Sequence, residues 1–321
     1  MSGFEVLVTA PQWSGEAAAR IAAAGGRLSY LPDMKPSEDA LLARLAEAPV
    51  DAIVLRGSAP LTARVLEAAR PRLKIVAKNG AGVDSVDLAA AARLGIAVAV
   101  AAGANAGAVA EHALALMLAL TRELPAQDRQ VRAGGWAGAG HQGRDFRGSV
   151  VGIVGYGAIG RATAQLARAL GARVIVLQRA GEADDDFEVE PTLERLLPRL
   201  DLLSLHCPLN DETRGLIGAR ELALLKPGAL LVNTARGALI DEPALIQALR
   251  SGRLAGAGLD CFAQEPLPAG HPLLALPQAI LSPHTAGVTR GAARQVALLT
   301  AANVLDHLAG LPLPPGHRLR A

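Results

Sequence analysis

Aromatic residues and cysteines are scarce in this 321-residue chain, which has two tryptophans, two tyrosines, four phenylalanines and two cysteines. Proteins that bind nucleic acid usually carry stacking aromatic side chains or a basic stripe. The formal net charge here is only +2, and neither feature appears, so we expect no nucleic-acid partner. Two cysteines, Cys207 and Cys261, are too few for a disulfide framework. Such sparse use of cysteine is typical of a reducing compartment, and we expect a cytoplasmic protein.

The chain also lacks a long, uninterrupted apolar run. Its most apolar stretch, residues 94–110, is interrupted by Gly103, Asn105 and Gly107. A transmembrane helix needs about 20 consecutive apolar residues, so we interpret this stretch as a strand, a hinge and the start of a helix. The first ten residues lead directly into a strand pattern rather than a signal peptide, and we expect neither a targeting segment nor a membrane partner.

Short apolar runs alternate with helical patterns along the whole chain. This alternation predicts an α/β fold with two doubly wound parallel sheets, and the length supports two domains. The expected strands are residues 5–10, 52–55, 73–77, 97–100, 150–154, 173–177, 202–204, 229–232, 255–259 and 279–281. The expected helices are residues 15–24, 37–46, 62–69, 106–124 and 159–170. The helix at 106–124 is apolar enough to lie either in the core of one subunit or at a dimer interface.

One glycine-rich turn carries a recognisable pattern. Gly155, Gly157 and Gly160 form a G-x-G-x-x-G sequence between an expected strand and an expected helix. In dinucleotide-binding folds the first glycine allows the turn, the second admits the pyrophosphate, and the third lets the helix pack closely on the strand. The pyrophosphate rests on the N-terminus of the helix. We therefore predict a dinucleotide site that includes Ala158 and Ile159, with a turn that binds no ligand as the alternative.

Three polar segments follow expected strands in the second half of the chain and bring Arg236, Glu265 and His284. The carboxyl ends of parallel strands meet at the ligand crevice of an open sheet. A guanidinium grips a carboxylate with two hydrogen bonds, and a histidine transfers protons near neutral pH when a glutamate supports its charged form. Together they predict reduction of a 2-oxo acid. The alternative for each residue is a role without chemistry: Arg236 as a surface residue, Glu265 as a turn residue and His284 as a structural histidine. His206, at another strand end, is a second candidate for the acid–base role.

Several motifs, in the same order and over essentially the whole length, resemble the D-isomer-specific 2-hydroxyacid dehydrogenase family. Besides the glycine turn, they are Lys78–Asp84, Val109–His112, Cys207–Leu209 with Thr213, Leu225–Gly228, Asn233–Gly237, Gly258–Asp260, Glu265–Pro266 and Ser282–Gly287. The resemblance implies a flavodoxin-like substrate domain, residues 1–101 and 288–321, and a Rossmann cofactor domain, residues 102–287. It also implies hinges near Gly103 and Gly287 and a homodimer built on the helix that begins near Ala106.

The same resemblance implies a role for each matching residue. Arg236 would clamp the substrate carboxylate and carbonyl, His284 would be the acid–base, and Glu265 its carboxylate partner. Asp260 would hold the nicotinamide amide. Other cofactor contacts would come from Pro208, Thr213 and Thr234, and substrate contacts from the backbone N–H groups of Gly80, Ala81 and Gly82. No resident metal site is expected.

Two positions bear on the choice of cofactor. NAD-preferring members of the family usually place an acidic residue at the end of the second strand of the cofactor domain, where this chain has Gln178 and Arg179. Gln178 does not repel a 2′-phosphate, and Arg179 adds a cation that can pair with one. We therefore expect NADP to be favoured over NAD, with NAD as the alternative. The acidic run from Glu182 to Glu188 is expected to be a solvated loop, and it would argue against NADP if it folded back towards the site.

Arg56 and Lys78 match positions that are basic in phosphoglycerate dehydrogenases. They predict a pocket for a second anionic or polar group, as in 3-phosphoglycerate, hydroxypyruvate or tartronate semialdehyde; two solvated cations are the alternative. Small residues follow Trp136, where phosphoglycerate enzymes tend to supply another cation, so reduction of hydroxypyruvate or glyoxylate is equally expected. We expect no regulatory domain of the kind that many phosphoglycerate dehydrogenases carry.

Three other functions are compatible with the same fold. A dehydrogenase-like sensor or corepressor would bind NAD(P) without catalysis, and an inactive relative would keep only the fold. A formate dehydrogenase would usually carry glutamine at the position of Glu265. The intact set of Arg236, Glu265 and His284 favours catalysis.

Overall fold

The computed structural model describes residues 3–178 and 186–319, and the chain forms two compact units. Unit 1 comprises Met1–Asn105 and Thr289–Ala321, and unit 2 comprises Ala106–Val288. The chain therefore leaves unit 1 once and returns to it through a C-terminal segment. It changes units after Asn105 and after Val288, whereas the sequence predicts hinges near Gly103 and Gly287.

Unit 1 contains a six-stranded sheet in the order β13-β5-β4-β3-β1-β2, in which only β13 is antiparallel to its neighbour. Without β13, this is the 2-1-3-4-5 order of flavodoxin-like folds. The strands are β1 (Phe4–Val8), β2 (Gly26–Tyr30), β3 (Ala52–Leu55), β4 (Ile75–Lys78), β5 (Ala97–Val100) and β13 (Arg318–Leu319). The predicted flavodoxin-like unit is confirmed.

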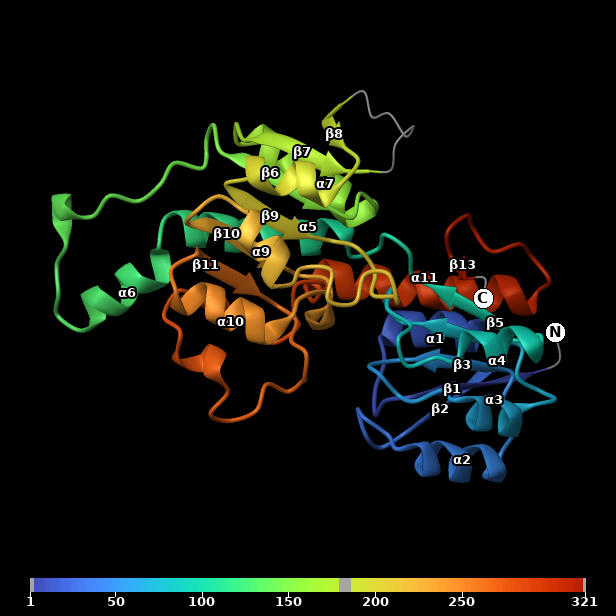
Figure 1. Cartoon of the computed structure of the whole chain (residues 1–321). Helices are drawn as coiled ribbons and strands as arrows, with labels where there is room; N and C mark the ends of the chain where they lie inside the picture. Colours follow the sequence, from blue (N-terminus) through green and yellow to red (C-terminus); the bar gives the residue numbers. More distant parts are fainter. Residues whose placement is uncertain (1–2, 179–185, 320–321) are drawn as a thin grey trace. The chain divides into compact units, whose positions relative to one another are not determined.

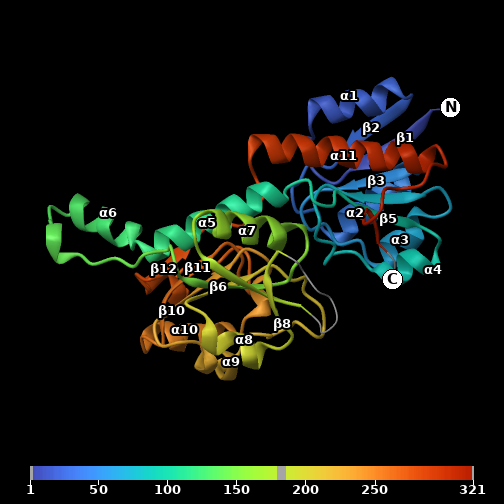
Figure 2. The ribbon, with the colours of Figure 1, turned by 90° about the horizontal axis from the view of Figure 1, so that it is seen from above.

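Both faces of this sheet are covered by helices, so its strands are apolar on both sides. Leu7, Ile53 and Val76 lie in the core cluster on one face, while Val6 and Val54 lie in the cluster on the other. Figure 2 shows α1 and α11 along one face and the remaining three helices along the opposite one. The helices are α1 (Gly15–Ala23), α2 (Glu38–Glu47), α3 (Ala63–Ala69), α4 (Leu88–Arg93) and α11 (Arg290–Leu308). Each begins after a Ser, Thr or Asp whose side chain accepts a hydrogen bond from an N–H of the first turn.

Unit 2 contains a seven-stranded parallel sheet in the order β12-β11-β10-β9-β6-β7-β8. Figure 1 labels the strands from β11 to β8. The order reverses between β6 and β9, the topological switch point at which doubly wound sheets bind ligands. The strands are β6 (Val150–Val154), β7 (Arg173–Leu177), β8 (Glu188–Glu190), β9 (Leu202–Leu205), β10 (Ala229–Asn233), β11 (Leu254–Leu259) and β12 (Ala279–Leu281). The predicted Rossmann unit is confirmed.

Helices cover both faces of the second sheet as well. Ala113 and Met117 of α5 and Ala164 of α7 pack on one face, and Leu222 of α9 and Leu245 of α10 pack on the other. The helices are α5 (Ala106–Thr121), α6 (Leu124–Arg132), α7 (Ala158–Ala169), α8 (Leu193–Leu196), α9 (Ala219–Leu224) and α10 (Glu242–Arg250). Short 3₁₀ turns lie at η1 (Gly138–Gly140), η2 (Leu197–Arg199), η3 (Gly237–Leu239) and η4 (Pro272–Ala275).

Two local predictions are wrong. The helix expected at 106–124 ends at Thr121, because Glu123 adopts a left-handed backbone conformation with φ +53°, and a separate helix, α6, follows. The acidic run is not a loop throughout: Glu188 lies in β8, where its carboxylate binds Arg173 and Arg199. These arginines neutralise the carboxylate and allow it to sit in an edge strand.

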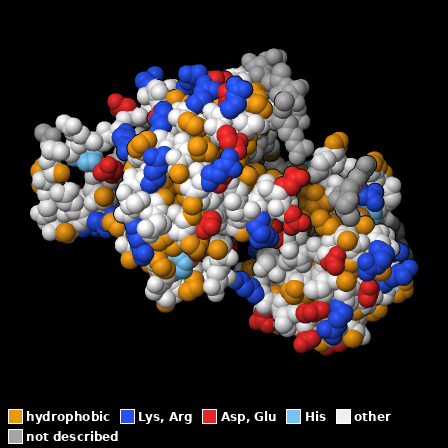
Figure 3. Space-filling view, viewed as in Figure 1, with side chains coloured by type: hydrophobic (Ala, Val, Ile, Leu, Met, Phe, Trp, Pro, Cys, Tyr) orange, Lys and Arg blue, Asp and Glu red, His pale blue; other side chains and the backbone are white. Residues whose placement is uncertain are grey.

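The surface is mixed in sign, as the small net charge implies. Basic and acidic side chains both occur across the face shown in Figure 3. Over residues 3–178 and 186–319, no helix is long and apolar enough to cross a membrane. The stretch at 94–110 contains strand β5, a turn and the start of α5, as predicted.

Candidate active site

The glycine turn of unit 2 has the geometry that a dinucleotide requires. Gly155 has φ +96°, and a Cβ there would lie 2.2 Å from the backbone nitrogen of Cys207. A Cβ on Gly160 would lie 2.0 Å from the carbonyl oxygen of Gly155, so α7 packs against the turn only because both residues are glycine. A Cβ on Gly157 would meet no described atom within 4 Å, and this open space is where a phosphate approaches the backbone in such folds.

The N-terminus of α7 and two buried polar atoms face the same end of the sheet. In the described part of the chain no side chain caps α7, so the first-turn N–H groups around Ala158 and Ile159 are available to an anion. Strand register places His206 and Thr234 beside each other, directly after β9 and β10. His206 Nδ1 and Thr234 Oγ1 are both buried and have no hydrogen-bond partner among residues 3–178 and 186–319. Buried polar atoms normally have partners, which indicates that a ligand supplies them here.

The other predicted cofactor residues lie on neighbouring loops of unit 2. Gln178 directly follows β7, and its backbone N–H donates to Glu190 of β8. Pro208 and Thr213 belong to the loop after β9, where the Thr213 hydroxyl donates to the Pro208 carbonyl at 2.7 Å. Arg179 lies outside the described residues, as does most of the acidic run.

His284 and Glu265 form a hydrogen-bonded pair. His284 Nδ1 lies 2.7 Å from Glu265 Oε2, and about half of the imidazole surface is exposed. The neighbouring Cys261 side chain and the Glu265 carboxylate raise the pKa of His284 to about 10, so the imidazole is charged at neutral pH. Burial would raise the pKa of Glu265, but hydrogen bonds from His284 and from the Phe262 N–H hold it below its ordinary value. The pair can therefore hold a proton ready for donation.

The loop that carries His284 is held in an unusual conformation by a buried carboxylate. His284 has φ +55°, a left-handed conformation that non-glycine residues seldom adopt and that persists only where surrounding contacts maintain it. Asp260 is fully buried and accepts hydrogen bonds from the Thr285 N–H at 2.9 Å and the Ala286 N–H at 2.8 Å. It also accepts the Ser282 hydroxyl at 2.6 Å. These three bonds hold the loop on both sides of the histidine.

The loop of Arg236 lies against the loop after β11. The Asn233 side chain bridges this loop, because its amide donates to the Arg236 carbonyl at 2.8 Å and accepts the Ala235 N–H at 3.0 Å. A Cβ on Gly237 would lie 2.0 Å from the Phe262 carbonyl carbon, so the two loops touch through their backbones. The Arg236 charge also contributes to the lowered pKa of Glu265. Arg236, Glu265 and His284 therefore share one region of unit 2.

The structure distinguishes the two competing histidines. Burial lowers the pKa of His206 to about 4, so its imidazole is neutral at physiological pH. Its Nε2 lies 2.9 Å from the Ser204 hydroxyl of its own strand, whereas His284 contacts a carboxylate. A neutral histidine with such a low pKa is a poor proton donor at neutral pH, and His284 is favoured.

Unit 1 presents its predicted substrate residues at the carboxyl ends of β3 and β4. The Arg56 guanidinium donates to the Gln12 carbonyl, and the Lys78 ammonium donates to the Gly57 carbonyl. The Gly80 N–H donates to the Lys78 carbonyl at 2.9 Å. Between described residues, the N–H groups of Ala81 and Gly82 make no backbone hydrogen bond.

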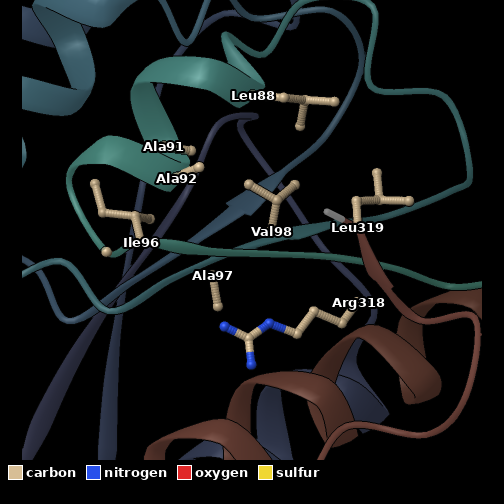
Figure 4. A pocket seen from close by; sticks show the side chains of 9 residues that line it. Leu88, Ala91, Ala92, Ile96, Ala97, Val98, Arg318 and Leu319 are labelled. Atoms are coloured by element: carbon tan, nitrogen blue, oxygen red, sulfur yellow. The ribbon is translucent and has the colours of Figure 1, made fainter. Parts of the chain in front are cut away.

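A cavity of about 450 Å³ also lies in unit 1, but at the opposite end of the strands (Figure 4). Its walls include α4, Ile96 directly before β5, and Leu319 of β13. In open α/β sheets ligands bind at the carboxyl ends of the strands, so this cavity does not compete with the strand-end residues as the reaction site.

One family model and several known proteins are similar in sequence to this chain. Residues 114–286, more than half of the chain, match the model of the D-isomer specific 2-hydroxyacid dehydrogenase NAD binding domain. A glyoxylate reductase of Korarchaeum cryptofilum is 39% identical over 289 residues, which cover 87% of this chain and 85% of that protein. A D-3-phosphoglycerate dehydrogenase of Mycobacterium tuberculosis is 40% identical over 283 residues, 87% of this chain. The match spans only 53% of that longer protein.

Solved structures agree with these relatives. A glyoxylate reductase from Paecilomyes thermophila superposes with a TM-score of 0.85 at 32% identity and covers 100% of this chain and 98% of its own. Two further neighbours were solved with cofactors of different kinds. An acyclic imino acid reductase with NADPH and D-Arg has a TM-score of 0.87 at 26% identity, covering 98% and 99% of the two chains. A formate dehydrogenase from Staphylococcus aureus with NAD has a TM-score of 0.85 at 26% identity, covering 99% of both chains.

Proposed function

Because the chain belongs to the D-isomer-specific 2-hydroxyacid dehydrogenase family, we propose that it transfers a hydride between NAD(P) and a small D-2-hydroxy acid or its 2-oxo acid. One observation carries this proposal: a charged His284–Glu265 pair and Arg236 share one region of a unit that also has a dinucleotide turn. A sensor or an inactive relative has no need of a proton donor held in this way.

In this proposal the protein residues bind the substrate and supply the proton. Arg236 binds the carboxylate and stabilises negative charge on the carbonyl oxygen, because a guanidinium offers parallel N–H donors. His284 donates its proton to that oxygen, and Glu265 stabilises the charged imidazole before the transfer. The family resemblance predicts that Asp260 holds the nicotinamide amide, but Asp260 is fully buried and both of its carboxylate oxygens bind the loop of His284. We therefore assign it a positioning role, since it holds the backbone on both sides of His284.

The cofactor would lie along the strand ends of unit 2. Gly155, Gly157, Gly160 and the first turn of α7 would bind the pyrophosphate, and Thr234 and His206 would each gain a partner for a buried atom. Pro208 and Thr213 would line the same site. A bound nicotinamide supplies the hydride.

The test is a spectrophotometric assay with a panel of substrates. We expect oxidation of NADH or NADPH with glyoxylate, hydroxypyruvate or 3-phosphohydroxypyruvate, and reduction of NAD(P)⁺ with the corresponding D-2-hydroxy acids. Formate is included because a formate dehydrogenase is among the structural neighbours. Tight cofactor binding without turnover on any of these substrates would instead favour the sensor or corepressor.

We propose that NADP(H) is moderately favoured and that NAD(H) is also used, because Gln178 follows β7 where a carboxylate would repel the 2′-phosphate. Gln178→Asp should shift the ratio of kcat/KM values towards NADH by about tenfold or more, since a charge-assisted hydrogen bond contributes about 1.5–3 kcal/mol. The measurement is kcat/KM for both cofactors in both proteins. A wild-type preference for NADH, or an unchanged ratio in the variant, would contradict this assignment.

We propose that Arg56 and Lys78 bind a second anionic group on the substrate. Arg56→Ala and Lys78→Ala should each raise KM for 3-phosphohydroxypyruvate by about tenfold, the effect of losing one charged hydrogen bond, and leave KM for glyoxylate within about twofold. Arg93→Ala, which removes an exposed cation of unit 1 paired with Glu67, is the matched control. Equal KM values for all anionic substrates in every variant would rule out the pocket.

We also propose a homodimer in the cytoplasm. Helix α6 buries none of its residues, and Leu124, Val131 and Trp136 are exposed, Trp136 by 83%. Figures 1 and 2 both show α6 projecting from unit 2, and such exposed apolar segments mark interaction surfaces. Both cysteines are free thiols, as in a reducing compartment. Light scattering should give twice the chain mass for the wild type and a lower mass for Trp136→Glu; a monomeric wild type would contradict the dimer.

A further inference from the structure

Cys261 has no assigned contact with substrate or cofactor, yet it lies in the acid–base cluster beside His284. Its Sγ, a Glu265 carboxylate oxygen and a His284 ring nitrogen all lie within 4.8 Å of one another. The thiol donates to the Ala235 carbonyl at 3.3 Å, so it is held in place by the loop of Arg236. Three different ligand types therefore converge at one point of unit 2.

The combination of sulfur, imidazole and carboxylate selects a particular class of ion. Zn²⁺ binds thiolate at about 2.3 Å and imidazole or carboxylate at about 2.0–2.2 Å, in tetrahedral sites. Two ligands of one such ion lie roughly 3.5 Å apart, so the three side chains need to shift by only about 1 Å. Hard cations such as Mg²⁺ and Ca²⁺ prefer an all-oxygen shell and gain nothing from the sulfur.

The burial of the three residues leaves a route to the sulfur. Cys261 is only 2% exposed, whereas the side chains of His284 and Glu265 are 48% and 35% exposed. An ion can therefore approach past the imidazole and the carboxylate and bind the thiolate behind them. Three protein ligands on one side leave the fourth tetrahedral position open to water or to a substrate oxygen.

We propose that Cys261, Glu265 and His284 form an inhibitory site for a thiophilic divalent cation such as Zn²⁺ or Cd²⁺. Binding releases to solvent both the thiol proton and the proton on the imidazole nitrogen that binds the metal, and the metal then occupies the imidazole and the carboxylate that the proton-transfer step requires. The proposal of a metal site depends only on the geometry of this cluster. The proposal that the metal inhibits the enzyme also depends on the proposed function.

Metal binding is measured without turnover, by titrating tag-free protein with Co²⁺ and following the thiolate-to-cobalt charge-transfer absorption, then displacing Co²⁺ with Zn²⁺. We expect one equivalent to bind to the wild type and to Cys207→Ser, which removes the chain's other cysteine. Cys261→Ser and Cys261→Val should bind at least about 100-fold more weakly, because losing a direct ligand costs no less than losing a supporting residue, worth about 10–100-fold. Circular dichroism confirms that each variant is folded.

For each protein, the turnover rate with the metal is then compared with the rate of the same protein without it. Saturating Zn²⁺ should reduce wild-type and Cys207→Ser turnover by at least about tenfold, reversibly with EDTA, since acid–base help contributes about 100-fold or more. Mg²⁺ should have no effect, and the Cys261 variants should keep most of their own metal-free rate. Charge-transfer absorption or zinc affinity that survives in both Cys261 variants would overturn the site. Cobalt binding that depends on Cys261 in a protein without dehydrogenase activity would overturn only the proposed function.

Discussion

Replacing His284 by alanine is expected to lower kcat for reduction of a 2-oxo acid by about 100-fold or more, because a positioned general acid contributes about 10²–10⁴ to the rate. The substrate and cofactor contacts assigned to Arg236 and to the glycine turn remain, so KM values should change little. The measurement is steady-state kinetics with the best substrate of the panel.

The matched control is His271→Ala. His271 also contacts a carboxylate, with its Nε2 3.0 Å from Glu242 Oε1, but it precedes η4 and has no role in the proposed reaction. Its variant should retain kcat within a few-fold of the wild type. If His284→Ala were as active as His271→Ala, His284 could not be the proton donor.

Loss of Arg236 is expected to reduce enzyme activity at least as much as loss of His284. Arg236→Ala should reduce kcat/KM by about 10²–10³ or more, the effect of removing a donor to a developing oxyanion, with the carboxylate clamp lost as well. Arg236→Lys should recover only part of this activity, because an ammonium lacks the paired N–H groups of a guanidinium.

Added guanidinium provides a second measurement for Arg236. It should partly restore Arg236→Ala if the side chain acts directly on the substrate. A fully active Arg236→Ala variant would show that Arg236 does not bind the substrate carboxylate. A weakly active variant whose cofactor Kd rises while substrate KM is unchanged would reassign Arg236 to cofactor binding.

The buried strands are the part of the fold that the sequence predicts best. Strands such as β3, β5 and β10 are covered on both faces and read as continuous apolar runs. Strands β2, β8 and β13 are not predicted, because these three edge strands contain polar or charged residues, as in the Glu-Val-Glu sequence of β8. The edge strand β12 is entirely apolar and is predicted. The break before α6 was also missed, since an isolated glutamate at position 123 is no signal for a left-handed residue.

The arrangement of the residues at the strand ends is only partly predictable from the sequence. Parallel topology makes it predictable that segments after β10, β11 and β12 share one edge of the sheet. The resemblance predicts the pairing of His284 with Glu265, but it predicts none of the other side-chain contacts around them. The bonds from Asp260 to the His284 loop, the buried Nδ1 of His206 and the closeness of Cys261 to His284 all depend on loop conformations. The motif Gly258–Asp260 predicts a functional role for Asp260. The hydrogen bonds of Asp260 to the His284 loop can be seen only in the structure.

The most direct test of the central claim is the fate of the hydride. The reduced cofactor, deuterated at both C4 positions of the nicotinamide, is incubated with a 2-oxo acid whose product is chiral, such as hydroxypyruvate, and the product is analysed by mass spectrometry and chiral chromatography. We predict a D-2-hydroxy acid with one deuterium at C2, derived from the cofactor. A product of L configuration, or one whose hydrogen at C2 comes from solvent, would contradict it.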